Sequence, residues 1–260
     1  MLRSFLSARH LAACFLIALT ACSATTTSER PASSASSEGA DVQLEVRRLP
    51  KQDFVFAFLT AGPQEGQLGQ QEMGQAMAGH FANMKRLGEE GLLLLAGPLW
   101  EPRSDPDHRG LFVFDVSVPA DALALAQTDP SIQAGVLEVS CHPFRSATDL
   151  RRLPDLIRAR NAELEAEGPA QPGVPRAVRG YAIVTTTALD ETALDRLTLF
   201  DAVLVSGQFG GALDGTSLLV VDAPDVDAAR ERLVSLGVDC TNFTFHGFFG
   251  SDTLPSLRDA

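Results

Sequence analysis

His80 is the residue whose type and position in the sequence most directly suggest chemistry. It lies within residues 67–90, where apolar side chains recur every three or four positions, the spacing of one face of an α-helix. That face holds Met73, Met77, His80, Met84 and Leu87. A histidine in such a place can act as a general acid or base when a carboxylate orients its ring. A core histidine with one satisfied hydrogen bond is the simpler interpretation of the same pattern.

Three other residues carry weaker chemical signals. Trp100 follows Gly97-Pro98, where we expect a strand to end and a loop to begin, so its ring can stack on a planar ligand or anchor the loop. His142 and His246 occupy matching places and could meet as metal ligands, but two histidines without a third ligand indicate little. We therefore expect no metal and no cofactor.

Cys141 and Cys240 are the cysteines of the part of the chain expected to fold. An oxidising compartment permits a disulfide between them, but their separation does not follow from the sequence. Neither has the CxxC spacing of a zinc or redox motif, and buried free thiols are the simpler expectation.

Residues 47–148 are expected to form a β-α-β-β-α-β unit, the ferredoxin-like arrangement. Apolar runs bounded by Gly and Pro indicate the strands, and helical periodicity indicates the helices. The expected strands are 54–59, 92–96, 111–118 and 136–144, and the expected helices are 67–90 and 120–127.

Residues 179–253 repeat this order in a shorter form. The expected strands are 180–187, 203–207, 216–222 and 243–249, and the expected helices are 191–201 and 225–236. His142-Pro143-Phe144 near the end of the first copy matches His246-Gly247-Phe248 near the end of the second, which indicates duplication. Residues 149–178 between the copies are charged and then rich in Pro and Gly, so we expect a connecting helix and a linker.

One such unit covers a single face of its sheet with helices and leaves the other face bare. A bare apolar sheet face must be buried against a partner. Two copies in one chain can bury these faces against each other, as in a dimer joined covalently. The sequence therefore predicts an α+β fold built from two ferredoxin-like βαββαβ repeats, in a monomer that contains a pseudo-dimer. Further dimerisation stays open.

The first copy resembles a known family. His80 on its helix, Gly97-Pro98 after a strand, Asp129-Pro130 after the second helix and the final His142-Pro143-Phe144 occur in the order found in the YCII-related family, over about residues 53–146. Members of that family have the dimeric α+β barrel fold. The resemblance implies that His80 and Asp129 form the active pair. A turn in which Asp simply precedes Pro is the alternative for Asp129.

The second copy departs from the family pattern. Asp190 stands where the first copy has His80, and no Asp-Pro follows the second helix. We therefore expect a degenerate repeat without a site of its own.

The N-terminus resembles a bacterial lipoprotein signal peptide, residues 1–21. A basic start precedes an apolar run at 11–19, which is too short to span a bilayer. Leu19-Thr20-Ala21-Cys22 resembles a lipobox, which implies that Cys22 becomes the acylated first residue and carries palmitate. Ser23 resembles the outer-membrane sorting pattern. An ordinary secretory signal with an incidental cysteine is the alternative.

Residues 22–46 are rich in Ser, Thr and Ala and are expected to form a flexible tether. With a lipid at Cys22, the tether predicts a protein held in the cell envelope, on the outer membrane and facing the periplasm. Several acyl chains give stable anchoring where one gives only marginal binding.

The acidic net charge and the lack of a long apolar run argue against nucleic-acid binding and against a membrane-spanning helix. The chain has 33 acidic and 21 basic residues and a net charge of −12. Phosphate binding needs clustered Lys and Arg, so a nucleic-acid partner is not expected. No run of 18 apolar residues occurs, so no membrane-spanning helix is expected either.

Two functions follow from these observations. The first is an enzyme of the lyase or isomerase type, in which His80 and Asp129 move a proton on a small cyclic or aromatic substrate without a cofactor. Related barrels that act as muconolactone isomerases and as a dehydrochlorinase of hydroxylated aromatics favour it. The second is a non-catalytic ligand-binding or interaction module in the envelope.

Overall fold

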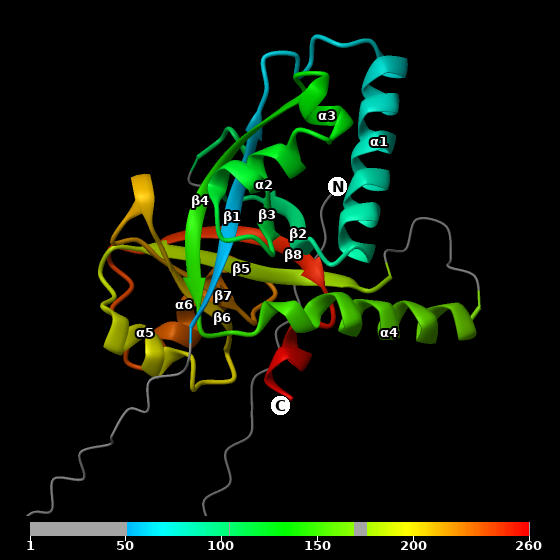
Figure 1. The fold of residues 1–260 in the computed structure, drawn as a ribbon. Coiled ribbons are helices and arrows are strands. Elements are labelled where there is room, and N and C mark those ends of the chain that lie inside the picture. The colour runs from blue at the N-terminus through cyan, green and yellow to red at the C-terminus, as the bar shows by residue number, and fades with distance from the viewer. Residues whose placement is uncertain (1–50, 104, 169–175, 260) are drawn as a thin grey trace, which may run out of the picture. The chain divides into compact units, whose positions relative to one another are not determined.

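The computed structural model describes residues 51–103, 105–168 and 176–259. The predicted signal peptide, Cys22 and the predicted tether lie outside these residues. The first repeat contains β1 (Gln52–Ala61), α1 (Gln70–Glu89), β2 (Leu93–Trp100), β3 (His108–Phe114), α2 (Pro119–Ala126), α3 (Pro130–Gln133) and β4 (Leu137–Ser146) (Figure 1). A 3₁₀ turn, η1 (Leu150–Arg152), and α4 (Leu153–Ala166) follow it.

The second repeat has the same order with shorter helices. It contains β5 (Val178–Thr186), α5 (Glu191–Leu197), β6 (Val203–Phe209), η2 (Gly211–Leu213), β7 (Ser217–Val221), α6 (Val226–Ser235) and β8 (Thr244–Ser251), and the 3₁₀ turn η3 (Leu254–Arg258) follows. None of the helices described is long and apolar enough to cross a membrane.

Two local predictions were wrong. β2 does not end at Gly97-Pro98 but continues to Trp100. A proline is tolerated there because β2 pairs with β8 only from Leu99 onward. The short helix α3 was not predicted at all, because four residues are too few to show a helical period. Asp129 and Pro130, for which a simple turn was the alternative, are the N-cap and first residue of α3.

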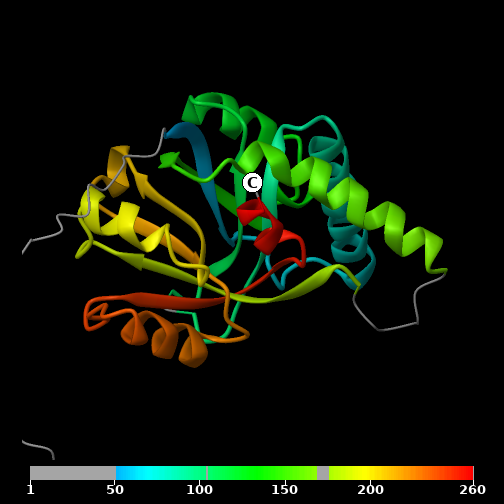
Figure 2. The ribbon, with the colours of Figure 1, turned by 90° about the horizontal axis from the view of Figure 1, so that it is seen from below.

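The eight strands close into one barrel in the order β1-β3-β2-β8-β5-β7-β6-β4 (Figure 2). Each repeat contributes four neighbouring strands, and the repeats meet at two seams, β2 with β8 and β4 with β6. All pairs are antiparallel. The predicted α+β fold, in which two ferredoxin-like repeats make an intramolecular dimeric α+β barrel, is therefore confirmed.

The strand registers show the duplication residue by residue. Phe56 of β1 lies opposite His142 of β4, and Ile183 of β5 lies opposite His246 of β8. β2 and β6 each carry a register shift at the corresponding place in their pairing with β3 and β7. The two halves are thus equivalent in backbone pairing although their helices differ in length.

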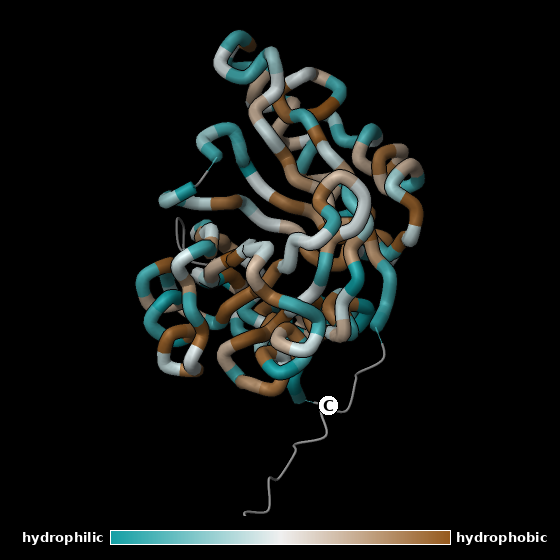
Figure 3. The backbone as a smooth tube through the Cα atoms, turned by 90° about the vertical axis from the view of Figure 1, so that its left-hand side faces the viewer, coloured by the Kyte–Doolittle hydropathy of each residue, from teal (hydrophilic) through white to brown (hydrophobic). Residues whose placement is uncertain are grey.

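The apolar core has three layers, as expected for a barrel with helices outside it. The barrel interior is filled by side chains from both repeats, including Phe56, Phe144, Ile183 and Phe248. α1 and α2 cover the outer face of the first sheet, and α5 and α6 cover that of the second. Strands buried on both faces need continuous apolar runs. Figure 3 shows runs of hydrophobic residues, in brown, alternating with hydrophilic ones along the backbone.

Each seam contains a glycine on which a phenylalanine ring from the other repeat packs. A Cβ at Gly207 of β6 would lie 2.3 Å from Cζ of Phe144, and a Cβ at Gly97 of β2 would lie 2.7 Å from Cε2 of Phe248. Real Cβ atoms do not approach other atoms so closely. The two glycines therefore allow the repeats to meet.

We predict that Gly207→Ala lowers the free energy of unfolding by about 1–3 kcal/mol, because the added methyl group overpacks the seam. Gly74→Ala is the matched control, since its Cβ meets open space in the helix α1 and alanine favours the helix by about 1 kcal/mol. Urea unfolding of both variants measures the difference. Equal stability of the two variants would show that the seam tolerates the extra atom.

Candidate functional site

Helix α1 places His80 against the outer face of the first sheet. The buried residues of α1 are Ala76, His80, Asn83 and Leu87. The predicted stripe faces the sheet, since His80 and Leu87 are buried and the half-buried Met73 and Met84 pack against the same core. The imidazole of His80 stacks on the ring of Phe112 in β3, with 5.9 Å between ring centroids and 22° between the planes. The ring is thus held flat against the sheet.

The short helix α3 places Asp129. One carboxylate oxygen, Oδ1, accepts hydrogen bonds from the backbone N–H of Ser131 at 2.9 Å and from its hydroxyl at 2.7 Å. α3 packs closely on α1, because a Cβ at Gly79 would lie 2.6 Å from Cγ of Pro130. The glycine thus lets the two helices approach, beside the position of His80.

These placements bring the two predicted residues together. His80 Nδ1 and Asp129 Oδ2 are 2.8 Å apart, although the residues are separated by 49 positions in the chain. Asp129 is fully buried and His80 is 7% exposed. Ser131 Oγ lies 3.3 Å from the same ring nitrogen.

The electrostatics of the pair favour one arrangement of protons. Burial alone would raise the pKa of Asp129, but the hydrogen bonds from His80 and Ser131 outweigh it and the pKa lies below its ordinary value. The carboxylate is therefore ionised, and Nδ1–H of His80 donates to it. That leaves the lone pair on Nε2, for which the described residues provide no hydrogen-bond donor.

A second set of contacts holds the segment before Asp129. Asn83, one helical turn after His80, accepts a hydrogen bond at Oδ1 from Arg86 at 2.8 Å. Arg86 also donates to the hydroxyl of Thr128 at 3.1 Å. α1 therefore holds two consecutive residues, Thr128 and Asp129. Sequence reasoning missed Asn83 and Ser131, although their spacing from His80 and Asp129 (three and two residues) was a usable signal.

Trp100 belongs to the end of the strand β2 and not to the loop after it. It is the last residue of β2 at the seam with β8, and its side chain is 60% exposed. Its indole meets the ring of Phe249 edge-on, with 5.7 Å between centroids. Ligand binding by Trp100 stays a prediction.

His142 and His246 lie on the inner side of the barrel strands, with His108 nearby. His108 stacks on Phe58 at 4.9 Å, and the rings of His108 and His246 are 5.9 Å apart. Within the described residues no three His, Cys, Asp or Glu side chains are grouped to hold a metal ion. Burial, with a smaller contribution from His108, lowers the pKa of His246 to about 4.

Cys141 and Cys240 are both free thiols. They belong to different outer layers of the core, one on each repeat. Burial raises the pKa of the Cys141 thiol to about 11, so the group stays protonated.

In the second repeat, the position that matches His80 holds an aspartate that caps a helix. Asp190 is the N-cap of α5, and its carboxylate accepts a hydrogen bond from the backbone N–H of Ala193 at 2.7 Å. α5 has 7 residues where α1 has 20. The shorter helix begins where the histidine stands in the first repeat.

Two adjoining cavities lie between α1 and α4. The larger is a groove of about 1140 Å³ and the smaller a pocket of about 510 Å³. His80 and Asp129 are not among the residues that line either. His80 contacts the groove wall indirectly, through Phe81, whose ring centroid lies 5.4 Å from its own.

Fold and site together define a dimeric α+β barrel within one chain, with a His–Asp pair on the outer face of its first half. Residues 55–145 match the YCII-related domain family. This confirms the resemblance seen in the sequence.

Among solved structures, a mutant chlorite dismutase from Candidatus Nitrospira defluvii is similar, with 14% identity and a TM-score of 0.44, over 82% of this chain and 95% of that one. Similarity at this level carries no chemistry to the present chain. No curated protein gives a significant sequence match.

The lowered pKa of His246 predicts a pH dependence of stability. The folded protein binds this proton less readily than the unfolded chain, so stability is full above about pH 6.5 and falls as the pH drops toward 4. The loss attributable to His246 amounts to about 3 kcal/mol. His246→Gln should remove this part of the acid sensitivity, which urea unfolding between pH 7 and 4 would measure. An unchanged slope in the variant would contradict the assignment.

Proposed function

We propose that the YCII-related domain is an acid–base enzyme that moves a proton on a small cyclic or aromatic substrate without a cofactor. The observation that carries this proposal is the 2.8 Å contact between His80 Nδ1 and Asp129 Oδ2, which assigns the basic lone pair of the imidazole to Nε2. Asp129 is itself held by Ser131, so the base and the group that orients it are both fixed.

In the proposed reaction, Nε2 of His80 takes a proton from a carbon of the substrate. The imidazolium that forms is stabilised by the buried carboxylate of Asp129 through Nδ1–H. The electron pair left on the substrate then either takes the proton back at another carbon, which is an isomerisation, or expels a leaving group from the neighbouring atom, which is an elimination. Phe112 supports the imidazole from the core, and the ring of Phe81, which is 61% exposed, meets the imidazole edge-on, so aromatic surface lies beside the base. This surface favours a planar, apolar substrate.

A non-catalytic ligand-binding module is the second candidate. The groove between α1 and α4 favours it, because the groove is large enough for a small molecule and does not include His80.

We further propose that the protein is a lipoprotein anchored through Cys22 in the cell envelope, on the outer membrane and facing the periplasm. The support is the lipobox-like sequence and the tether behind it. The net charge of −12 would not attract the protein to an anionic bilayer, so the acyl chains would have to hold it there.

The catalytic proposal predicts that His80→Gln and Asp129→Asn each lower turnover by about 10²–10⁴-fold, since each removes one member of the base and its orienting group. A panel of unsaturated lactones and halogenated hydroxyaromatics, assayed in D₂O for deuterium uptake or halide release, identifies the substrate. His142→Gln is the control, because its ring lies on the inner side of the barrel. Full turnover by His80→Gln on a confirmed substrate would exclude the mechanism.

The anchoring proposal predicts that Cys22→Ser abolishes incorporation of labelled palmitate and moves the protein from the membrane to the soluble fraction of the envelope. Cys141→Ser should keep both the label and the membrane location, since its thiol belongs to the folded part. Absence of label from the unmodified protein would instead favour an ordinary secretory signal.

A further inference from the structure

Asn83 lies one helical turn after His80 on the buried face of α1, and one atom of its amide group has no partner. Its Oδ1 accepts hydrogen bonds from Arg86 at 2.8 Å and from the hydroxyl of Thr128 at 3.1 Å. A guanidinium group carries only donors, so the atom that Arg86 meets must be the amide oxygen, and this fixes the orientation of the amide. Nδ2, on the other side of the amide, is buried and finds no acceptor among the described residues.

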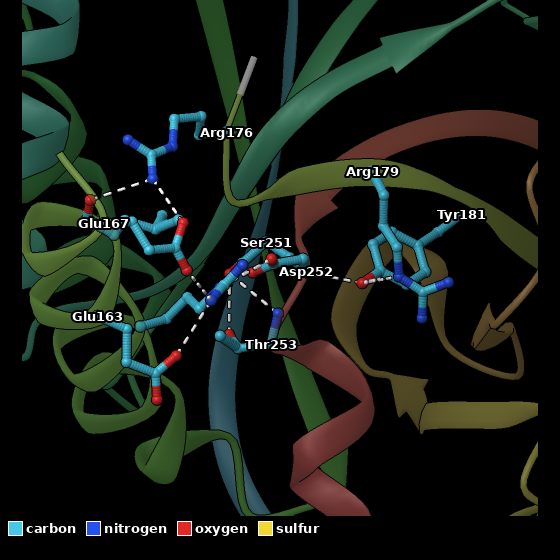
Figure 4. Close-up of polar contacts among 10 residues, drawn as sticks. Glu163, Glu167, Arg176, Arg179, Tyr181, Ser251, Asp252 and Thr253 are labelled. Atoms are coloured by element: carbon cyan, nitrogen blue, oxygen red, sulfur yellow. Dashed lines mark hydrogen bonds and ion pairs between the residues drawn. The ribbon is translucent and has the colours of Figure 1, made fainter. Parts of the chain in front are cut away.

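A buried N–H without an acceptor costs stability, so it calls for an explanation. Asp252 and Arg258 also carry a buried atom without a hydrogen bond, but ion pairs account for both. The other oxygen of Asp252, which Figure 4 shows among the polar contacts after β8, bonds Arg160 at 3.1 Å. Nε of Arg258 lies 3.3 Å from Asp201. The amide of Asn83 is neutral, so no ion pair compensates its Nδ2 in this way.

The position of Asn83 places this donor beside the proposed base. Residues three apart on a helix are neighbours on one face, with about 5–6 Å between their Cβ atoms. His80 and Asn83 are 7% and 8% exposed, so they are shielded from water to the same degree. A substrate that brings a carbon atom to Nε2 of His80 must therefore displace side chains and enter the layer in which Asn83 lies. Phe81, whose ring meets that of His80 and is 61% exposed, can swing aside to open this way.

The reaction proposed for His80 needs a hydrogen-bond donor of this kind. An imidazole removes a proton from a carbon atom only when the electron pair left behind can spread onto an oxygen, as it does beside a carbonyl group. That oxygen then carries negative charge, and a fixed N–H stabilises it. Asp129 cannot serve, because its ionised carboxylate only accepts. Ser131 cannot serve either, because its hydroxyl donates to Asp129.

On the basis of the proposed function, we propose that Nδ2 of Asn83 donates a hydrogen bond to the substrate oxygen, and that the substrate is a cyclic carbonyl compound with an acidic C–H beside the carbonyl group. Nε2 of His80 takes the proton from that carbon. The C–H electron pair then forms a carbon–carbon double bond, and the π pair of the carbonyl group moves onto its oxygen, which accepts from Nδ2. In a β,γ-unsaturated ketone, the γ-carbon takes the proton back from His80 and the carbonyl group is restored, so the product is the conjugated isomer.

Isomerisation of cyclohex-3-enone to cyclohex-2-enone tests the donor, because the conjugated product is detected by its ultraviolet absorbance. Asn83→Leu should lower kcat by about 10²–10³-fold with KM nearly unchanged, the effect of losing one donor to an oxyanion. Asn83→Asp should be slower still, because Arg86 keeps the new carboxylate ionised and its second oxygen repels the enolate. A residue that only fills space would give the reverse order, since Asp matches Asn in shape and Leu does not.

Stability separates this role from a structural one. Asn83→Leu removes a buried unpaired donor, and Arg86 and Thr128 keep their hydrogen bonds to Glu90 and Leu125, so its midpoint of urea unfolding should equal or exceed that of the unmodified protein. Asn242→Leu is the matched control, because it makes the same change at an exposed position of the second repeat and should keep full turnover.

Binding of an enolate mimic tests the donor without turnover. The 4-nitrophenolate anion carries its charge on the oxygen of a planar ring and undergoes no proton abstraction from carbon. When it saturates the protein, the side-chain amide signals of Asn83 should shift in ¹H–¹⁵N NMR spectra, where their absence from Asn83→Leu identifies them. Asn83→Leu should bind the anion at least about tenfold more weakly, as expected for a lost hydrogen bond to a charged group. His80→Gln should still show the shifted signals.

Two results would overturn the proposal. Absence of saturable binding of 4-nitrophenolate, or Asn83 signals that do not move when it binds, would mean that a fixed water molecule satisfies Nδ2. Full turnover by Asn83→Leu with loss of turnover in His80→Gln would reject the donor and leave the proposed catalysis standing. Shifted Asn83 signals without any turnover of cyclohex-3-enone would support the donor and count against the proposed reaction.

Discussion

Burial of the inner sheet faces is the constraint on which the rest of the molecule depends. Each βαββαβ repeat covers one side of its sheet with helices and leaves a row of large apolar side chains on the other. Those side chains reach a dry environment only when the two sheets close on each other. The seams must therefore be tight, and the glycines at positions 97 and 207 let a phenylalanine of the opposite repeat cross each of them.

Barrel closure also explains why the two repeats have diverged without losing the fold. The interior needs both halves, so the backbone pairing of the second repeat stays in register with the first. The outer faces of the two sheets take no part in closing the barrel. There the first repeat has a long helix with His80, and the second has a short helix that starts at Asp190. A site on the outside of one half can thus exist without a copy on the other.

The outer face of the first repeat carries two different arrangements on either side of α1. On one side, Gly79 and Pro130 bring α3 close, so that Asp129 meets His80 in a buried pair. On the other side, a groove separates α1 from α4, which is joined to Asp252 through Arg160. The close packing of α3 on α1 favours a fixed pair of proton-transferring residues. The wider separation of α4 from α1 leaves space in which a small molecule could bind. Phe81 touches both, since its ring meets His80 and lines the groove.

The sequence alone determined the order of elements, the duplication and the likeness of the first half to YCII-related domains, because apolar periodicity and the Gly-Pro and Asp-Pro pairs are local signals. His80 and Asp129 followed from that likeness. Their contact, and the partners Ser131, Asn83 and Thr128, came only from the tertiary structure, because they depend on how closely α1 and α3 approach. The end of β2 at Trp100 was decided by pairing with a strand about 150 residues later in the chain. The groove was equally invisible in the sequence, since α4 meets groups that lie far away in the chain, such as Asp252 after β8. Local patterns specify which elements form, but distances between elements arise only when the whole barrel has closed.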